Sequence, residues 1–164
     1  IVVDAWLNFP ELHENPGIHL LVAGNGIIPR ESALSGLKNV TIEKKRFSNE
    51  EFAALIDLCD IILLPYREIS QSGLLLTAIG MKKAVIVSKC NGLLEPFRIG
   101  EIGWIMSENN SSVLVKTIDQ IRRKIAHRDR IVTEEIWDKV HDYYSWNRIS
   151  RETETLYLDL IGEK

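Results

Sequence analysis

The amino-acid sequence predicts an α/β protein with a Rossmann-like, doubly wound parallel sheet, helices on both faces and a helical carboxyl-terminal tail. Short apolar runs, typical of buried strands, alternate with helical patterns up to Met106, and after Ser107 the pattern is only helical. The length of 164 residues, with 45% hydrophobic residues, suits one domain with a proper core. We therefore take 1–164 as a single domain and 108–164 as its helical tail.

The first part of the chain is predicted to hold two buried strands between short helices. In chain order these elements are an apolar helical face up to Pro10, a helix through Leu12, a strand at 19–23, a helix at 31–37 and a strand at 40–43. A domain seldom begins on a buried helix, and Ile1 is not a natural initiator. We therefore expect this chain to have been cut from a longer protein.

The rest of the chain continues the alternation and then becomes helical. Ser48 and Glu51 form a capping box, and the helix that they open has one buried face made of Phe52, Leu55, Ile56 and Cys59. Strands are expected at 61–64, 84–87 and 104–106, with a helix at 73–80. The tail is expected to contain three helices: one with Leu114, Ile118, Ile121 and Ile125 on one face, one near 133–144, and one that begins after Ser145 as N-cap.

Composition excludes several functional classes. The net charge of -3 does not suggest a general nucleic-acid surface, and no apolar stretch is long enough to cross a bilayer. Cys59 and Cys90 lie far apart and are expected to be reduced, buried thiols of a cytoplasmic protein. The histidines are scattered and form no metal-binding pair; they are His13, His19, His127 and His141. No metal site is therefore expected.

Ligands of a doubly wound sheet bind outside the carboxyl ends of its strands, which directs attention to three loops. Gly24-Asn25-Gly26 follows the first strand, but Pro29 stands where a dinucleotide-binding fingerprint needs a glycine. Gly24 is then either part of a tight turn or a point of close approach to a ligand. The basic run Lys44–Phe47 follows the second strand, as a solvated face or as the frame of a nucleobase.

The third loop, 65–73, joins a buried strand to the start of a helix and is the most informative. Unpaired N–H groups at a helix start carry partial positive charge, and Ser72 and Gly73 would let an anion such as phosphate approach. The alternative is an ordinary capped turn between a strand and a helix.

The order of these segments resembles the carboxyl-terminal, donor-binding domain of family 4 glycosyltransferases (glycosyl transferases group 1), which is one half of a GT-B fold. The segments that carry the resemblance are His19–Gly26, Asn39–Thr41, Asp60–Tyr66, Gln71–Gly73 with Ala78, Lys83–Val87, Asn91–Glu95, Gly100 and Gly103 with Trp104, and Ser145-Trp146 with Tyr157. They cover nearly the whole chain.

The resemblance implies retaining transfer of a sugar from a nucleotide diphosphate donor, in polysaccharide or glycoconjugate synthesis and without a metal or cofactor. It implies donor-binding roles for Gly24, Arg46, Phe47, Ser70, Gln71, Ser72, Gly73, Leu74 and Thr77. A second, acceptor-binding domain would be the missing partner, so this chain alone is expected to be inactive. The last helix would cross toward that domain and leave Trp146, Ile149 and Leu156 partly uncovered. A peripheral membrane association of the full protein stays open.

Two departures keep another interpretation open. Many members of that family have two carboxylates across the third loop, and the corresponding positions here are Ile69 and Thr77. Glu68, one residue early, is the candidate catalytic substitute. A non-catalytic nucleotide-binding or scaffolding module of the same fold is therefore the alternative. A flavodoxin-like or receiver-like domain, the third and weaker candidate, would need an acidic cluster at the strand ends, which this sequence does not show.

Overall fold

The computed structural model describes residues 1–126 and 131–162, so His127 lies outside the described residues. Its strands form two parallel ladders, with the orders β1-β2 and β3-β4-β5. The first ladder consists of β1 (Leu20–Ala23) and β2 (Val40–Glu43), paired from Leu20 with Val40 onward. The second consists of β3 (Ile61–Leu64), β4 (Ala84–Val87) and β5 (Gly103–Ile105).

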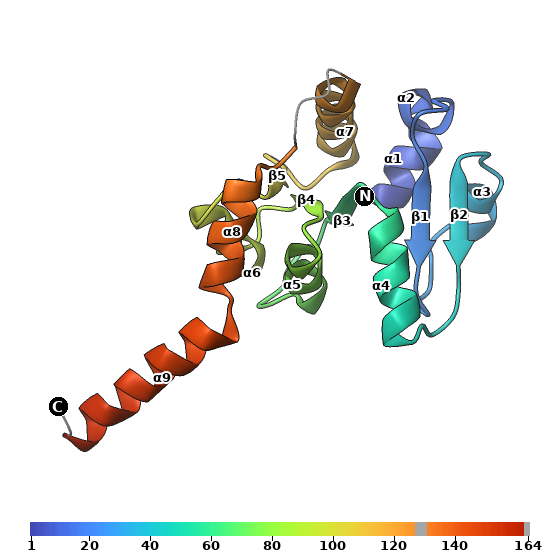
Figure 1. Ribbon diagram of the computed structural model, residues 1–164. Helices are drawn as coiled ribbons and strands as arrows, with labels where there is room; N and C mark the ends of the chain where they lie inside the picture. The colour runs from blue at the N-terminus through green and yellow to red at the C-terminus, as the bar shows by residue number, and fades with distance from the viewer. Residues whose placement is uncertain (127–130, 163–164) are drawn as a thin grey trace.

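Helices connect these strands and form the tail (Figure 1). They are α1 (Val2–Asn8), α2 (Pro10–His13), α3 (Glu31–Ser35), α4 (Asn49–Leu58), α5 (Gly73–Gly80), α6 (Asn91–Leu94), the 3-10 helix η1 (Pro96–Arg98), α7 (Ser111–Ala126), α8 (Glu134–Tyr143) and α9 (Trp146–Ile161). The predicted fold class, parallel strands flanked by helices with a helical tail, is confirmed. The sequence did not predict the division into two ladders.

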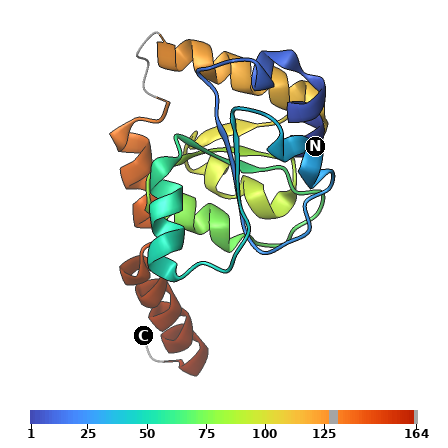
Figure 2. The same cartoon turned by 90° about the vertical axis from the view of Figure 1, so that its right-hand side faces the viewer.

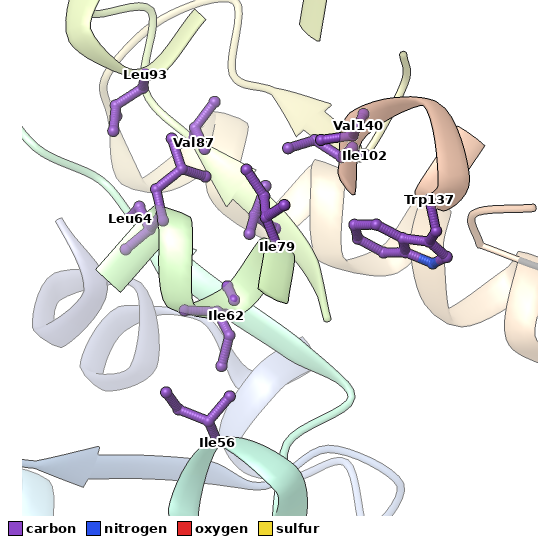
Figure 3. Packing of buried hydrophobic residues seen from close by; sticks show 12 residues of the cluster. Ile56, Ile62, Leu64, Ile79, Val87, Leu93, Ile102, Trp137 and Val140 are labelled. Atoms are coloured by element: carbon purple, nitrogen blue, oxygen red, sulfur yellow. The ribbon is translucent and has the colours of Figure 1, made fainter. Parts of the chain in front are cut away.

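The hydrophobic core lies on both faces of the strands, because alternate residues of a strand point to opposite sides. One cluster contains Ile62, Leu64, Val85 and Val87 together with residues of α4, α5, α6 and α8. Figure 3 shows this cluster, with Ile79 of α5 and Trp137 of α8 among its labelled side chains.

The other cluster contains Ile86 of β4 and the half-buried Ile61 and Leu63 of β3, packed with residues of α1, α2, α3 and α7. Leu20 and Val22 of β1 belong to it as well. This shared core is what joins the two ladders, since no backbone ladder runs between β1 and β3 in the described part of the chain.

Capping residues in the sequence predicted the starts of α4 and α9 correctly. The capping box at Ser48 is confirmed: its hydroxyl accepts from the Glu51 N–H, and the Glu51 carboxylate accepts from the Ser48 N–H. Ser145 caps α9 by accepting from the N–H of Arg148, also as predicted. The last strand begins one residue before the predicted 104–106, and the short α6 and η1 were not predicted.

One predicted helix face is only partly buried. In α4, Ile56 is 3% exposed, whereas Phe52 is 38% exposed, so the expectation that Phe52 is buried was wrong. Helical periodicity gives the direction in which a side chain points, but burial depends on what packs opposite it. Cys59 and Cys90 are both free thiols, but they are only half-buried, so the expectation that they are buried was wrong.

The last helix, α9, extends away from the strands in both views (Figures 1 and 2). It has no buried residue. The exposed fractions are 82% for Trp146, 37% for Ile149 and 58% for Leu156, which confirms that these side chains stay partly uncovered. In the described ranges, no helix has the length and apolar character that spanning a membrane requires.

Candidate functional site

The loop after β3 ends at the start of α5 with two free backbone N–H groups. Ser72 is 4% exposed, and its hydroxyl caps the helix by accepting from the N–H of Leu75 at 3.2 Å. Within 1–126 and 131–162, the N–H groups of Gly73 and Leu74 make no hydrogen bond. Gly73 is exposed, and a Cβ built on it would meet no atom within 4 Å. The helix therefore presents partial positive charge to open space.

The loop itself is held by the two loops that follow β4 and β5. The carbonyl oxygen of Tyr66 accepts from the hydroxyl of Ser88 at 2.5 Å and from Nδ2 of Asn109 at 2.9 Å. The thiol of Cys90 donates to the carbonyl oxygen of Arg67 at 3.1 Å. Three strand ends thus converge on the backbone of Tyr66 and Arg67, which gives this loop a defined position.

Close packing fixes the next part of the same loop. A Cβ built on Gly92, in α6, would lie 2.4 Å from the carbonyl oxygen of Ser70 and 2.5 Å from that of Ile69. Real Cβ atoms do not approach backbone atoms so closely, so only glycine fits here. The start of α6 and the loop 69–70 are therefore in direct backbone contact.

Replacing Ser88 with alanine is expected to lower the free energy of unfolding by about 1 kcal/mol, measured by urea denaturation. The variant removes the buried hydroxyl that donates to Tyr66, but the carbonyl oxygen keeps its bond from Asn109. Ser35→Ala is the matched control, because its exposed hydroxyl only donates to Ser32 within α3, and about 0.5 kcal/mol or less should be lost. Equal losses in the two variants would contradict the assigned role of Ser88.

The other residues with predicted roles in this loop and in α5 differ in burial and in their contacts. Glu68, Ser70 and Gln71 are exposed. Ile69 packs against the core cluster that contains α5 and α8, so this position contributes to packing. The hydroxyl of Thr77 donates to the carbonyl oxygen of Gly73 at 2.9 Å, which leaves its lone pairs, but not its proton, for a ligand.

The other predicted residues lie at the carboxyl end of the β1-β2 ladder. Gly24 has φ of 147°, faces open space, and its N–H donates to the carbonyl oxygen of Glu43 at 3.0 Å. Arg46 is exposed, and Phe47 is half-buried beneath the ammonium of Lys45, 5.1 Å from the ring centre. No hydrogen bond joins Gly24, Arg46 or Phe47 to the loop after β3 in the described ranges.

Sequence reasoning missed three residues that support the site: Ser88, Cys90 and Asn109. Gly92 belongs to the segment Asn91–Glu95 that carries the family resemblance, but its contact with the loop after β3 was not predicted. A signal existed for Ser88 and Cys90, because both follow the strand 84–87 directly and thus lie where parallel strands place their ligand loops. Asn109 carried no such signal. Among the residues that the structure describes, no group of three or more His, Cys, Asp or Glu side chains is arranged to hold a metal.

The chain is similar to known glycosyltransferases in sequence and in fold. Residues 4–124 match the family described as glycosyl transferases group 1. A glycosyltransferase from Rickettsia africae has a TM-score of 0.70 and 18% identity over 99% of this chain and 45% of that chain. Sucrose-phosphate synthase from Thermosynechococcus elongatus has a TM-score of 0.72 and 18% identity over 99% of this chain and 43% of that one.

This chain thus spans less than half the length of either solved structure. Among curated proteins, no sequence matches it.

Proposed function

The chain belongs to the glycosyl transferases group 1 family, and we propose that it is the carboxyl-terminal, donor-binding half of a retaining glycosyltransferase with the GT-B fold. The donor would be a nucleotide diphosphate sugar. The acceptor would bind a second domain, so the chain alone would bind the donor without completing transfer. The free thiols of Cys59 and Cys90 agree with a reducing compartment, and the proposal places the reaction in the cytoplasm.

The observation that supports this proposal best is the start of α5. The N–H groups of Gly73 and Leu74 make no hydrogen bond in the described ranges, and the exposed Gly73 ends a loop that three strand ends hold in place. A helix start of this kind attracts phosphate, because its N–H groups donate hydrogen bonds and carry partial positive charge. The exposed loop residues Ser70 and Gln71 would add polar contacts to the donor.

The chemistry of the transfer explains why such a site would promote it. As the bond between the sugar and the phosphate breaks, positive charge builds on the sugar and negative charge on the leaving diphosphate. N–H dipoles that are already in position stabilise this negative charge without having to reorganise. The exposed Glu68 is the proposed carboxylate near the sugar, and Thr77, Gly24, Arg46 and Phe47 are proposed to contact the nucleoside.

A non-catalytic nucleotide-binding or scaffolding module of the same fold is the second candidate. Two observations favour it: Ile69 is committed to the core, and the hydroxyl proton of Thr77 is used within α5. Ile69 and Thr77 also stand where many family members have carboxylates, and neither residue has one to offer to a donor. Donor turnover by a longer chain that includes the acceptor domain would separate the two candidates.

The proposed site can be tested by placing a negative charge at Gly73. Isothermal titration of the parent chain with UDP, GDP and ADP is expected to show binding of at least one of them. Gly73→Asp should bind that nucleotide about tenfold more weakly or worse, since a carboxylate at about 4 Å repels a phosphate by roughly 1 kcal/mol even in water. Its fold should be retained, because Gly73 faces open space and an acidic side chain suits a helix start.

Gly73→Ala is the matched control, because it removes the glycine without adding charge, and it should bind the nucleotide nearly as well as the parent chain. Absence of heat with all three nucleotides, from folded protein, would overturn the donor-binding proposal and favour a scaffold. Equal affinity of Gly73→Asp and Gly73→Ala for the nucleotide would show that its phosphates do not bind at the start of α5.

A further inference from the structure

The strand β1 forms backbone hydrogen bonds on only one of its two edges. The N–H groups of Leu20 and Gly24 donate to carbonyl oxygens on the side of β2, at 2.9 Å and 3.0 Å. Successive residues of a strand direct their peptide groups to opposite sides, so those of Leu21 and Ala23 face away from β2. The other edge of β1 therefore presents N–H and C=O groups to whatever lies beside it.

The strand β3 shows the same one-sided pairing. The carbonyl oxygen of Leu64 accepts from the N–H of Ser88, which follows β4, at 3.2 Å. Ile62 and Leu64 therefore bond to β4, and the peptide groups of Ile61 and Leu63 face away from it. Because no ladder runs between β1 and β3 in the ranges 1–126 and 131–162, these edges have no strand to pair with.

The sequences of β1 and β3 lack the features that normally protect an open edge. Both strands are apolar throughout, with the sequences LLVA and IILL. By contrast β2, on an outer edge, carries Thr41 and Glu43. Open edges usually carry charges, prolines or bulges that prevent pairing with another strand, whereas continuous apolar runs are typical of strands inside a parallel sheet. By composition, β1 and β3 are therefore interior strands.

The residue Ile1 lies at the carboxyl ends of these two strands. Its carbonyl oxygen accepts from the hydroxyl of Ser111, at the start of the helix that follows β5, at 3.1 Å. Asp4 pairs with Arg30, in the loop after β1. Burial lowers the pKa of the Ile1 amino group, and the positive charges of Arg67, in the loop after β3, and of Arg30 lower it further. In Figure 1 the amino terminus accordingly lies between β3 and β1.

From Ile1 onward, α1 and α2 take the course of a crossover connection. They lead from the carboxyl ends of the strands back to the amino end of β1, which starts at Leu20. Successive parallel strands need such a connection, usually a helix, because each strand starts from the same end of the sheet. Ala5 and Trp6 of α1 are 0% and 2% exposed, in the core cluster that also holds side chains of β1 and β3. The helix α1 is thus packed as the connection between β1 and a preceding parallel strand.

We propose that the facing edges of β1 and β3 are the binding site for one further parallel strand, supplied by the residues directly before Ile1 in a longer form of this chain. The strand pairs with Leu21 and Ala23 on one side. On its other side it pairs with Ile61 and Leu63, and it thereby joins the two ladders into one sheet. Its carboxyl end lies beside the loop after β3, next to the candidate site. This inference concerns the sheet and does not depend on donor binding.

The test is residue-resolved hydrogen–deuterium exchange, followed by NMR, on three folded chains. The first is the parent chain, the second is extended before Ile1 by about eight of its natural residues, and the third carries a Gly-Ser run of the same length there. The inner-edge amides are those of Leu21, Ala23, Ile61 and Leu63. They are expected to exchange at least about tenfold more slowly with the natural extension than in the other two chains, because a ladder hydrogen bond must open before exchange.

The amides of Val40 and Ile42 are the matched control, because their N–H groups lie on the outer edge of β2. Their exchange rates should agree within about twofold in all three chains. Equal exchange of the inner-edge amides with the natural and the Gly-Ser extension would overturn the proposal. Slow exchange in the parent chain would overturn it as well, and loss of that protection on dilution would assign the edges to a second copy. Neither result would affect the proposed function, which nucleotide titration tests separately.

Discussion

Replacing Asn39 with aspartate is expected to lower the free energy of unfolding by about 3 kcal/mol or more at neutral pH. Asn39 is 9% exposed, and its Nδ2 donates to the carbonyl oxygens of Leu12 at 2.7 Å and Ile18 at 2.8 Å. Both partners are acceptors, so a carboxylate would replace two hydrogen bonds with two repulsive contacts. The segment before β1 would thus lose its attachment to the start of β2.

The pH dependence of this loss provides an independent check. Burial beside two carbonyl oxygens raises the pKa of an introduced carboxyl, because it disfavours the charged form. A group whose pKa is higher in the folded than in the unfolded protein binds more protons when folded, so its contribution to stability falls as pH rises. The difference between parent and Asn39→Asp, measured by urea denaturation, should therefore be smaller near about pH 5 than near about pH 8.

Asn15→Asp is the matched control for this chemical change. The amide oxygen of Asn15 accepts from the N–H of Gly17 at 3.0 Å, and a carboxylate accepts equally well. This variant should stay within about 0.5 kcal/mol of the parent chain. If Asn39→Asp were no less stable than Asn15→Asp, the amide of Asn39 would not be holding the segment in place.

Replacing Gly92 with alanine is expected to reduce both stability and nucleotide binding. The added Cβ would overlap the carbonyl oxygens of Ser70 and Ile69, which are backbone atoms and cannot rotate aside. Either α6 or the loop after β3 must move, at a cost of about 1–3 kcal/mol of unfolding free energy. Because that loop leads directly into the start of α5, we also expect weaker binding of the nucleotide that the parent chain binds, measured by titration.

Gly80→Ala is the matched control, since Gly80 ends α5 and a Cβ there would meet no atom within 4 Å. It should leave nucleotide binding unchanged and leave stability equal or up to about 1 kcal/mol higher, because alanine loses less backbone entropy in a helix. A Gly92→Ala chain that is as stable as the parent and binds as well would mean that α6 can retreat without displacing the loop.

The sequence alone was sufficient where the signal is local. Four of the five described strands coincide with, or lie within, the predicted strand ranges. The reason is clearest in β4, which is buried along its whole length and is therefore apolar throughout. The helix starts at Ser48 and Ser145 were predictable because a cap is completed within three residues. The exposed apolar strip of α9 was expected from the family resemblance instead, because an amphipathic pattern alone predicts a covered apolar face.

Contacts between distant parts of the chain were decided only by the tertiary structure. The amide of Asn39 reaches Leu12 and Ile18, Gly92 touches Ser70, and Asn109 donates to Tyr66, across 21 residues or more. The neighbouring sequence does not indicate which residue each of them contacts, since asparagine and glycine are equally common in surface turns. Parallel strands bring their carboxyl ends together only after the chain has crossed over between them, and for this reason the support of the candidate site became visible only in the folded chain.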